Sequence, residues 1–184
     1  MAAVAARPVY FGAFLVTSQV FYRTEHSFAL VNLKPLLPGH VLVCPNRVVA
    51  RLKDLSAPEI TDLFLTVQKI GKAVEHIYKA DALNIAMQDG VAAGQSVAHV
   101  HMHIIPRRFR DLEKEDQIYT MLESSDGDLG RSYLEADSQG LDASVGRPKF
   151  PTIPLDSERR PRTEQVMREE AVWLAERIRE SGVD

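Results

Sequence analysis

Short apolar runs separated by polar turns dominate the first half of the chain. Their length and alternation predict five strands, at residues 19–24, 28–32, 40–45, 83–89 and 99–105. One longer segment, 56–79, instead repeats its apolar residues at helical spacing. The order of strands, one long helix and then strands predicts an α+β domain with a mostly antiparallel five-stranded sheet.

The 56–79 segment carries the clearest helix signals. Ser56 and Glu59 form a capping-box pattern, and Pro58 suits the first turn. An apolar stripe follows, which predicts an amphipathic helix: Ile60, Leu63, Phe64, Val67, Val74 and Ile77.

Three regions differ in composition. Residues 1–123 hold the predicted strands and the long helix, and we assign them to one folded core. Residues 124–162 are rich in Ser, Asp, Gly and Pro, and predict a long mobile loop or insertion that buries too little apolar area to be ordered. Residues 163–184 regain helical spacing and predict a C-terminal helix packed on the core, with a stripe of Met167, Ala171, Leu174 and Ile178.

Half of the six histidines lie at alternate positions, His99, His101 and His103. Alternate residues of a strand share one face, so the three rings would line one face while Val100, Met102 and Ile104 join a core on the other. Burying three polar rings on one face costs free energy, and a protein that accepts this cost usually gains a function from it. The pattern therefore predicts a site.

Composition excludes several classes of protein. The chain has 184 residues, 45% hydrophobic and 26% charged, which indicates one ordinary globular domain. A net charge of −3 argues against a nucleic-acid partner. The single cysteine, Cys44, excludes an intrachain disulfide and fits a reducing compartment. Without a secretory pattern or an apolar run of membrane length, we expect no membrane partner and a cytoplasmic location, a nuclear one or both.

Three interpretations of the histidines compete. They could be structural residues, but each of three rings in register would then need its own partner. They could bind zinc or iron, but such sites usually add a carboxylate, and none follows within several positions. They could perform nucleophilic catalysis, because a neutral imidazole with a fixed tautomer attacks well at pH 7. For a phosphoryl substrate, Asn32, Gln88 and the Gly94-Gln95-Ser96 turn could position the phosphate.

The stretch His-Val-His-Met-His-Ile-Ile fits the His-φ-His-φ-His-φ-φ motif of the histidine triad superfamily, where φ is apolar. More narrowly, the chain resembles the fragile histidine triad branch, the dinucleoside triphosphate hydrolases, in the segments 27–45, 87–107 and 116–122. The resemblance covers about residues 10–123, together with the terminal helix around Met167. It implies the histidine triad fold and bis(5'-adenosyl)-triphosphatase activity.

The resemblance also implies catalytic roles. His101 would attack the α-phosphorus and form a covalent nucleotidyl-histidine, which water then hydrolyses. His103 would contact the α-phosphate and the leaving oxygen. His99 would orient the site, with His40 as a more distant partner.

The other implied contacts concern the substrate. Asn32 would contact the ribose, Leu30 and Phe11 would form walls of the base pocket, and Tyr119 would lie near the far end of the substrate. Relatives carry a substrate-contacting histidine near the position of Phe14. The phosphates would meet Gln88, Gly94, Gln95, Ser96 and Val97. We expect Arg107, Arg108 and Arg110 to form a solvated basic turn.

The resemblance implies a homodimer whose sheet continues across both subunits. It implies no metal site and no required cofactor, although Mg²⁺ or Mn²⁺ can accompany the polyphosphate. Two alternatives to the hydrolase stay open: a purine nucleoside phosphoramidase, and a nucleotide-binding signalling module with slow turnover.

Overall fold

The computed structural model describes residues 7–123, 128–139 and 161–182. A five-stranded sheet has the order β3–β4–β5–β7–β6, and every neighbouring pair is antiparallel. Its strands are β3 (Val20–Arg23), β4 (Ser27–Val31), β5 (Val41–Pro45), β6 (Ala82–Ala86) and β7 (Met102–Arg107). A separate hairpin joins β1 (Tyr10–Phe11) to β2 (Phe14–Leu15). The predicted α+β class and five-stranded sheet are confirmed.

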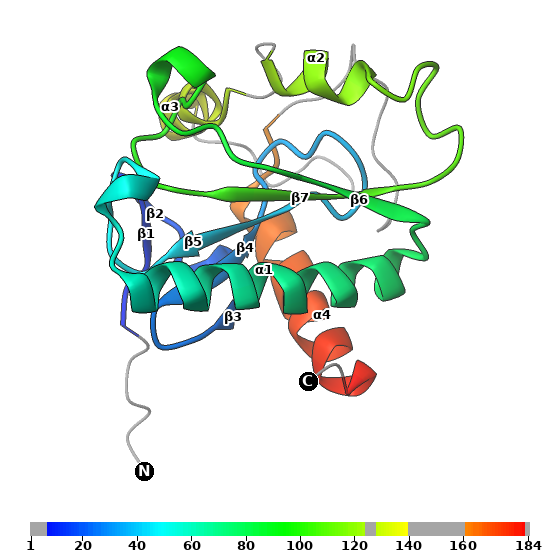
Figure 1. Ribbon diagram of the computed structural model, residues 1–184, viewed down its shortest axis with the longest axis horizontal. Helices are drawn as coiled ribbons and strands as arrows, with labels where there is room; N and C mark the ends of the chain where they lie inside the picture. The colour runs from blue at the N-terminus through cyan, green and yellow to red at the C-terminus, as the bar shows by residue number, and fades with distance from the viewer. Residues whose placement is uncertain (1–6, 124–127, 140–160, 183–184) are drawn as a thin grey trace.

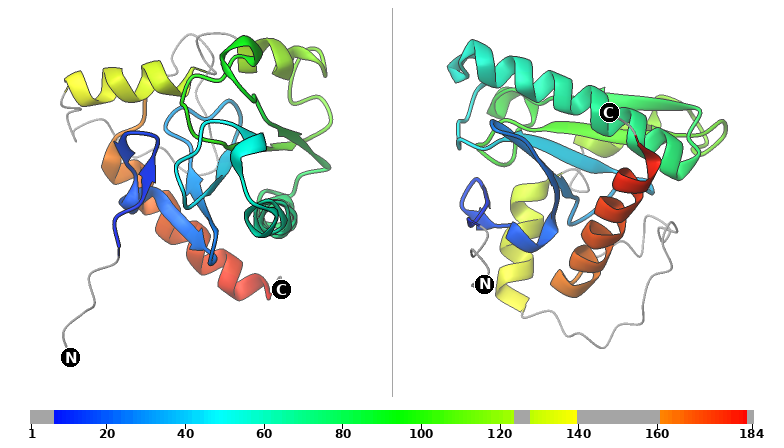
Figure 2. Two further views of the ribbon diagram at one scale, coloured as in Figure 1. Left: turned by 60° about the vertical axis from the view of Figure 1, so that its left-hand side comes forward. Right: turned by 90° about the horizontal axis from the view of Figure 1, so that it is seen from below.

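Four helices flank the sheet in the described part of the chain. They are α1 (Ala57–Tyr78), α2 (Gln117–Glu123), α3 (Leu129–Gln139) and α4 (Glu164–Ser181), with short 3-10 turns η1 (Thr17–Gln19), η2 (Leu52–Asp54) and η3 (Val91–Ala93). Helices α1 and α4 lie on one side of the sheet, and α2 and α3 on the other (Figure 1, Figure 2). None of these helices combines the length and apolar character needed to cross a bilayer.

Helix α1 begins and packs as its sequence predicts, with one exception. The Glu59 carboxylate accepts hydrogen bonds from the Ser56 amide at 2.7 Å and the Ser56 hydroxyl at 2.8 Å, which satisfies polar groups at the helix start. Leu63, Val67, Ile70 and Val74 are buried against the sheet. Phe64, which we placed in the apolar stripe, is 47% exposed because it lies at the edge of that stripe.

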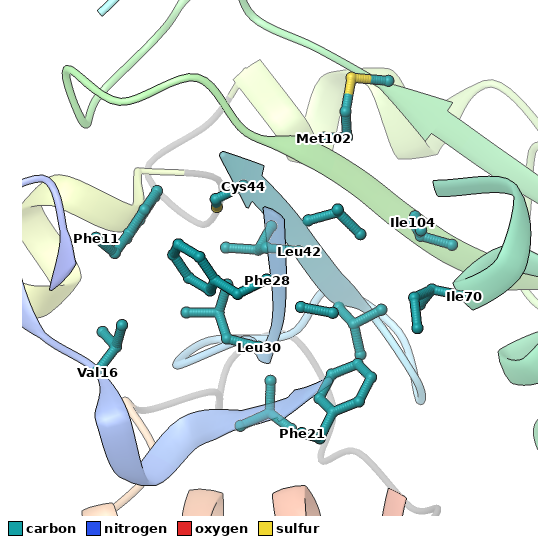
Figure 3. Packing of buried hydrophobic residues seen from close by; sticks show 14 of the residues in the cluster. Phe11, Val16, Phe21, Phe28, Leu30, Leu42, Cys44, Ile70, Met102 and Ile104 are labelled. Carbon is teal, nitrogen blue, oxygen red and sulfur yellow. The ribbon is translucent and has the colours of Figure 1, made fainter. Parts of the chain in front are cut away.

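The two faces of β7 have separate partners. Met102 and Ile104 belong to the core under α1, as the alternation predicts, whereas Ile105 belongs to a smaller apolar cluster with α2. Figure 3 shows Ile70 of α1 beside Ile104. Strand pairing places Leu30, Leu42 and His103 in one row across β4, β5 and β7. His103 therefore faces away from α1, on the side of the sheet that carries the site.

The expectation that one strand carries all three histidines is wrong, because β7 begins only at Met102. Its partner β5 ends at Pro45, which has no amide hydrogen to continue the ladder. The Val100 amide donates instead to the Val49 carbonyl, at 2.7 Å. The His99 amide donates to the Val97 carbonyl, also at 2.7 Å, which closes a tight turn. His99 and His101 thus lie on the segment leading into the strand.

Helix α3 lies where the sequence predicted part of a loop over 124–162. Leu129 and Tyr133, one helical turn apart, are 2% and 5% exposed and belong to the main core cluster, and the Tyr133 ring contacts Phe11 and Phe14 of the β1–β2 hairpin. Residues 124–127 and 140–160 of that expected loop lie outside the described residues. The predicted C-terminal helix is α4, capped by the Thr163 hydroxyl, which accepts from the Val166 amide.

Candidate active site

A hydrogen bond between two histidines fixes the tautomers at the centre of the site. The Leu36 amide donates to His40 Nδ1 at 3.1 Å, so the neutral His40 ring carries its proton on Nε2. His40 Nε2 lies 2.9 Å from His103 Nδ1, which must accept. The His103 proton is therefore on Nε2. That nitrogen is buried and has no hydrogen-bond partner among the described residues.

His101 presents the opposite nitrogen to the site. Its Nδ1 lies 2.7 Å from the His99 carbonyl oxygen, which can only accept, so Nδ1 carries the proton and Nε2 keeps its lone pair. The rings of His101 and His103 meet edge to face, with centroids 5.0 Å apart. A nucleophilic nitrogen thus lies beside a hydrogen-bond donor that lacks an acceptor.

His99 holds this arrangement together without offering a reactive atom. Its Nε2 donates to the Pro45 carbonyl at 2.9 Å, and its Nδ1 accepts from the Gly12 amide at 3.1 Å. A metal ion held by all three histidines would need a free nitrogen on each ring, and His99 has none. Among the described residues, no group of three or more His, Cys, Asp or Glu is arranged to hold a metal ion. The bonds favour the nucleophile interpretation over the metal site.

Burial keeps the three imidazoles neutral. Desolvation lowers the pKa of His99 to about 4 and lowers the pKa of His101 below its ordinary value. It also lowers the pKa of His103 well below its ordinary value, and the neighbouring His101 and His40 rings add to this effect. At pH 7 the site therefore holds an uncharged nucleophile and an uncharged donor.

Asn32 directly follows β4 and lies next to the hydrogen-bonded pair His40 and His103. It is fully buried, its Nδ2 lies 3.2 Å from His40 Nε2, and its Oδ1 accepts from the Lys34 amide at 2.9 Å. Its carbonyl oxygen accepts from the Arg162 guanidinium, which also forms an ion pair with Glu170. This contact joins the start of α4 to the site.

The loop between β6 and the histidines is braced by Gln95. The Gln95 Oε1 accepts from the Gly90 amide at 3.0 Å, and Nε2 donates to the carbonyls of Ala50, at 2.9 Å, and His99. Both ends of this amide are thus bonded to the backbone. Gln95 thereby fixes the shape of the loop, and its contact with the phosphates stays a prediction.

The remaining residues of this loop lie around the Gln95 side chain. Gly94 has φ +86°, and a Cβ there would lie 2.6 Å from the Gln88 amide nitrogen, so glycine allows Gln88 to approach. Ser96 is exposed, and its hydroxyl accepts from the Gly130 amide of α3 at 3.3 Å. Val97 is buried against Gly12 of the hairpin turn.

The predicted base-pocket walls are core residues here. Phe11 and Leu30 are fully buried; Figure 3 shows both near Phe28, away from Ile70. The Phe11 ring also meets His101 edge to face, with centroids 5.1 Å apart. Phe11 therefore supports the nucleophile directly.

Residues expected farther along the substrate lie at the other end of the sheet. Tyr119 on α2 is 56% exposed, and its hydroxyl accepts from Asn84 of β6 at 3.4 Å. The Arg107 guanidinium bonds Asp111 and the Asn84 side chain, so it serves the local fold.

Two groups of residues near the site were missed in the sequence. Arg162 precedes α4 and forms an ion pair with Glu170 within that helix, and Tyr133 lies on α3. Nothing in the local pattern indicates that Arg162 reaches Asn32, 130 residues away. The spacing of Leu129 and Tyr133 is a helical signal, but the surrounding Ser, Asp and Gly masked it.

Residues 14–110 match the HIT domain family model, which is more than half of the chain, so the chain belongs to the HIT family. It is 50% identical over 173 residues to the bis(5'-nucleosyl)-tetraphosphatase [asymmetrical] of Schizosaccharomyces pombe, covering 91% of this chain and 93% of that protein. It is 51% identical over 133 residues to the bis(5'-adenosyl)-triphosphatase of Dictyostelium discoideum, covering 72% of this chain and 89% of that protein.

Solved structures agree with this assignment. The NitFhit protein of C. elegans matches with a TM-score of 0.63 and 33% identity, covering 92% of this chain and 30% of that longer chain. The diadenosine triphosphate hydrolase of Plasmodium falciparum, solved with Cyclomarin A, matches with a TM-score of 0.57 and 31% identity, covering 73% of this chain and 88% of that chain.

Proposed function

We propose that the protein hydrolyses dinucleoside polyphosphates, such as diadenosine triphosphate, to a nucleoside monophosphate and the remaining nucleotide. The observation that carries the proposal is the pair of facing imidazoles. His101 offers a lone pair, and His103 offers a buried N–H that has no acceptor among the described residues. The hydrolase names of the similar proteins from S. pombe and D. discoideum support the same reaction.

In the first step, His101 Nε2 attacks the α-phosphorus. The N–P bond forms as the bond from phosphorus to the leaving oxygen breaks, and the second nucleotide departs. The imidazole gains positive charge, which the His99 carbonyl oxygen stabilises through the Nδ1 hydrogen. His103 donates its Nε2 hydrogen bond to oxygen on the phosphate or the leaving group, where negative charge develops.

In the second step, water attacks the same phosphorus. The N–P bond breaks, its electron pair returns to His101, and the water proton is released to solvent. Attack at the α-phosphorus yields unequal products: AMP and ADP from diadenosine triphosphate, or AMP and ATP from the tetraphosphate. This route accommodates both chain lengths in the relatives' names.

The nucleophile can be tested by replacing His101→Asn, with the exposed His76→Asn on α1 as the matched control. We expect turnover of diadenosine triphosphate to fall by roughly 10⁴-fold or more in the first variant and to be unchanged in the second. Substrate binding should largely survive. Acid-labile, base-stable nucleotide label should be trapped on the wild-type protein and on His76→Asn, but not on His101→Asn. Full activity of His101→Asn would refute the covalent route.

We also propose a homodimer. Within the described sheet, β6 has a neighbour on one side only, and its Ile85 is 47% exposed. On α1, Phe64 and Leu65 are 47% and 61% exposed. Such surfaces suit burial between symmetric copies. Sedimentation at micromolar concentration should give twice the 20.6 kDa mass of one chain, and a monomer mass would contradict the proposal.

Three further features complete the proposal. The reaction needs no resident metal or other cofactor, and Mg²⁺ or Mn²⁺ acts only as a companion of the polyphosphate. Nucleic acid is not a partner, in keeping with the net charge of −3. The protein acts in the cytoplasm, the nucleus or both. Activity that survives removal of divalent cations by chelation would support the first point, and complete loss would contradict it.

A further inference from the structure

The segment 32–40 carries the residues that orient His103. Asn32 stands at its beginning, the Leu36 amide donates to His40 Nδ1, and His40 stands at its end. None of the residues 32–40 belongs to a helix or a strand, so no ladder of hydrogen bonds fixes their backbone. The direction of the His40 proton that His103 accepts at 2.9 Å therefore depends on what else holds this segment.

Arg162, which precedes α4, holds the first end of the segment. Its amide donates to the Leu33 carbonyl at 2.9 Å, and its guanidinium Nε donates to the Asn32 carbonyl at 3.1 Å. One residue thus binds two successive carbonyls. The Arg162 side chain is only 15% exposed, so water competes little for its bonds.

Glu170 of α4 connects Arg162 to the other end of the segment. Its carboxylate lies 2.5 Å from the Arg162 guanidinium and accepts from the Tyr78 hydroxyl at 3.3 Å. The Tyr78 ring in turn lies against Gly39, because a Cβ added to that glycine would be 2.7 Å from the ring. Gly39 directly precedes His40. The Arg162–Glu170–Tyr78 network therefore contacts both ends of the segment.

The chemistry of this network suits positioning better than simple stabilisation. Glu170 and Tyr78 are buried, and two apolar side chains of similar size often stabilise a fold as well as a buried ion pair does. An apolar pair could not, however, bind a carbonyl oxygen. The guanidinium has a fixed fork of N–H groups, which can hold a carboxylate and a carbonyl oxygen at the same time.

We propose that Arg162 and Glu170 are positioning residues, which fix the segment 32–40 and thereby the hydrogen bond from His40 to His103. The reaction that they serve rests on the proposed function. Helices α1 and α4 lie on the face of the sheet away from the His103 ring (Figure 1), so the network acts on the site through the backbone of this segment. Helix α4, which lies outside the matched residues 14–110, thus helps to orient the catalytic proton.

The test compares single and double substitutions of the buried pair. Arg162→Met and Glu170→Met each leave one charge buried without its partner, so both variants should lose turnover and stability towards urea. The double variant, Arg162→Met with Glu170→Met, buries no charge and should recover much of the stability, but it lacks the bond to the Asn32 carbonyl. Its kcat for diadenosine triphosphate should therefore stay about 10- to 100-fold below wild type, with a smaller change in KM.

Two further variants complete the comparison. Tyr78→Phe removes only the hydroxyl that Glu170 accepts and keeps the ring on Gly39, so kcat should fall less than in the double variant. Arg177→Met is the matched control, because it breaks an exposed ion pair with Glu180 of the same helix. It should change neither kcat nor stability.

NMR of the histidine ring nitrogens reports the same hydrogen bond without substrate. The Nε2–H signal of His40 is assigned by its absence from His40→Phe. It should shift, or exchange faster with water, in the double variant and stay as in wild type in Arg177→Met. Wild-type kcat in the folded double variant, or an unchanged His40 signal, would overturn the inference. A changed signal in a protein that hydrolyses no dinucleotide would refute the proposed function and still support the positioning of His40 by this network.

Discussion

Replacing His40→Phe should slow catalysis although His40 touches no reacting atom. The change keeps an aromatic ring but removes the Nε2 proton that His103 Nδ1 accepts at 2.9 Å. His40 is 3% exposed, so water cannot readily replace the lost donor. A buried acceptor left without a partner costs about 1–3 kcal/mol. If this cost is felt in the transition state, where His103 must present its Nε2 proton, kcat falls about 5- to 150-fold.

Steady-state rates with diadenosine triphosphate would test this reasoning. We expect kcat to fall more than KM changes, because the lost bond orients a catalytic hydrogen rather than the bound substrate. The Leu36 amide also loses its acceptor, so unfolding by urea should be followed in parallel and rates measured where the variant is folded. His76→Phe on the exposed side of α1 is the control. A folded His40→Phe variant with wild-type kcat would refute the idea that the His40–His103 hydrogen bond orients the catalytic proton of His103.

Three further predictions concern stability. The unfolded chain binds a proton at His99 near pH 6.5, but the folded chain does so only near pH 4, so His99 should contribute a loss of roughly 3 kcal/mol of stability as pH falls between these values. Urea unfolding at pH 7, 5.5 and 4.5 should show this loss added to those from His101 and His103, whose pKa values burial also lowers, and His99→Asn should make the total loss smaller without abolishing it. Glu59 has its pKa lowered to about 2, first by the Arg47 hydrogen bond, so its contribution is complete above the ordinary carboxyl pKa and is lost as pH falls toward 2. Glu59→Gln should therefore cost about 1–3 kcal/mol at pH 7 by urea unfolding, with the difference from wild type vanishing near pH 2. Gly39→Ala should lower stability by more than about 1 kcal/mol, because φ is +80° and the added Cβ would lie 2.7 Å from the Tyr78 ring; an unchanged thermal midpoint would contradict this.

The sheet and the long helix could be predicted because their signals are local. Alternation and turn residues mark β3 to β6, and the Ser56–Glu59 pair marks the start of α1. The β1–β2 hairpin has strands of two residues each, too short for any periodic signal. The late start of β7 could not be predicted, because it depends on which residue of β5 faces Val100 and on Pro45 ending that strand.

The site also has features that the sequence predicts and features that it does not. The three histidines are visible from their spacing, but their tautomers depend on backbone carbonyls brought close by the fold, such as that of Pro45 beside His99. Gln95 illustrates the limit, because the Ala50 carbonyl that holds its amide is 45 residues away. A motif can show that a glutamine is present but cannot show whether its amide faces the substrate or the backbone.

The partners of the histidines explain how the site can be both buried and reactive. In a Ser-His-Asp triad a carboxylate orients the imidazole and stabilises its charged form. Here the His101 proton is held by the His99 carbonyl, an uncharged acceptor. A carboxylate in that place would raise the pKa of His101 and, in a buried setting, favour the protonated ring that cannot attack. The carbonyl fixes the tautomer while burial keeps the pKa low. The nucleophile thus stays neutral before attack, and the carbonyl dipole is already oriented to stabilise the positive charge that forms on the ring when phosphorus is bound.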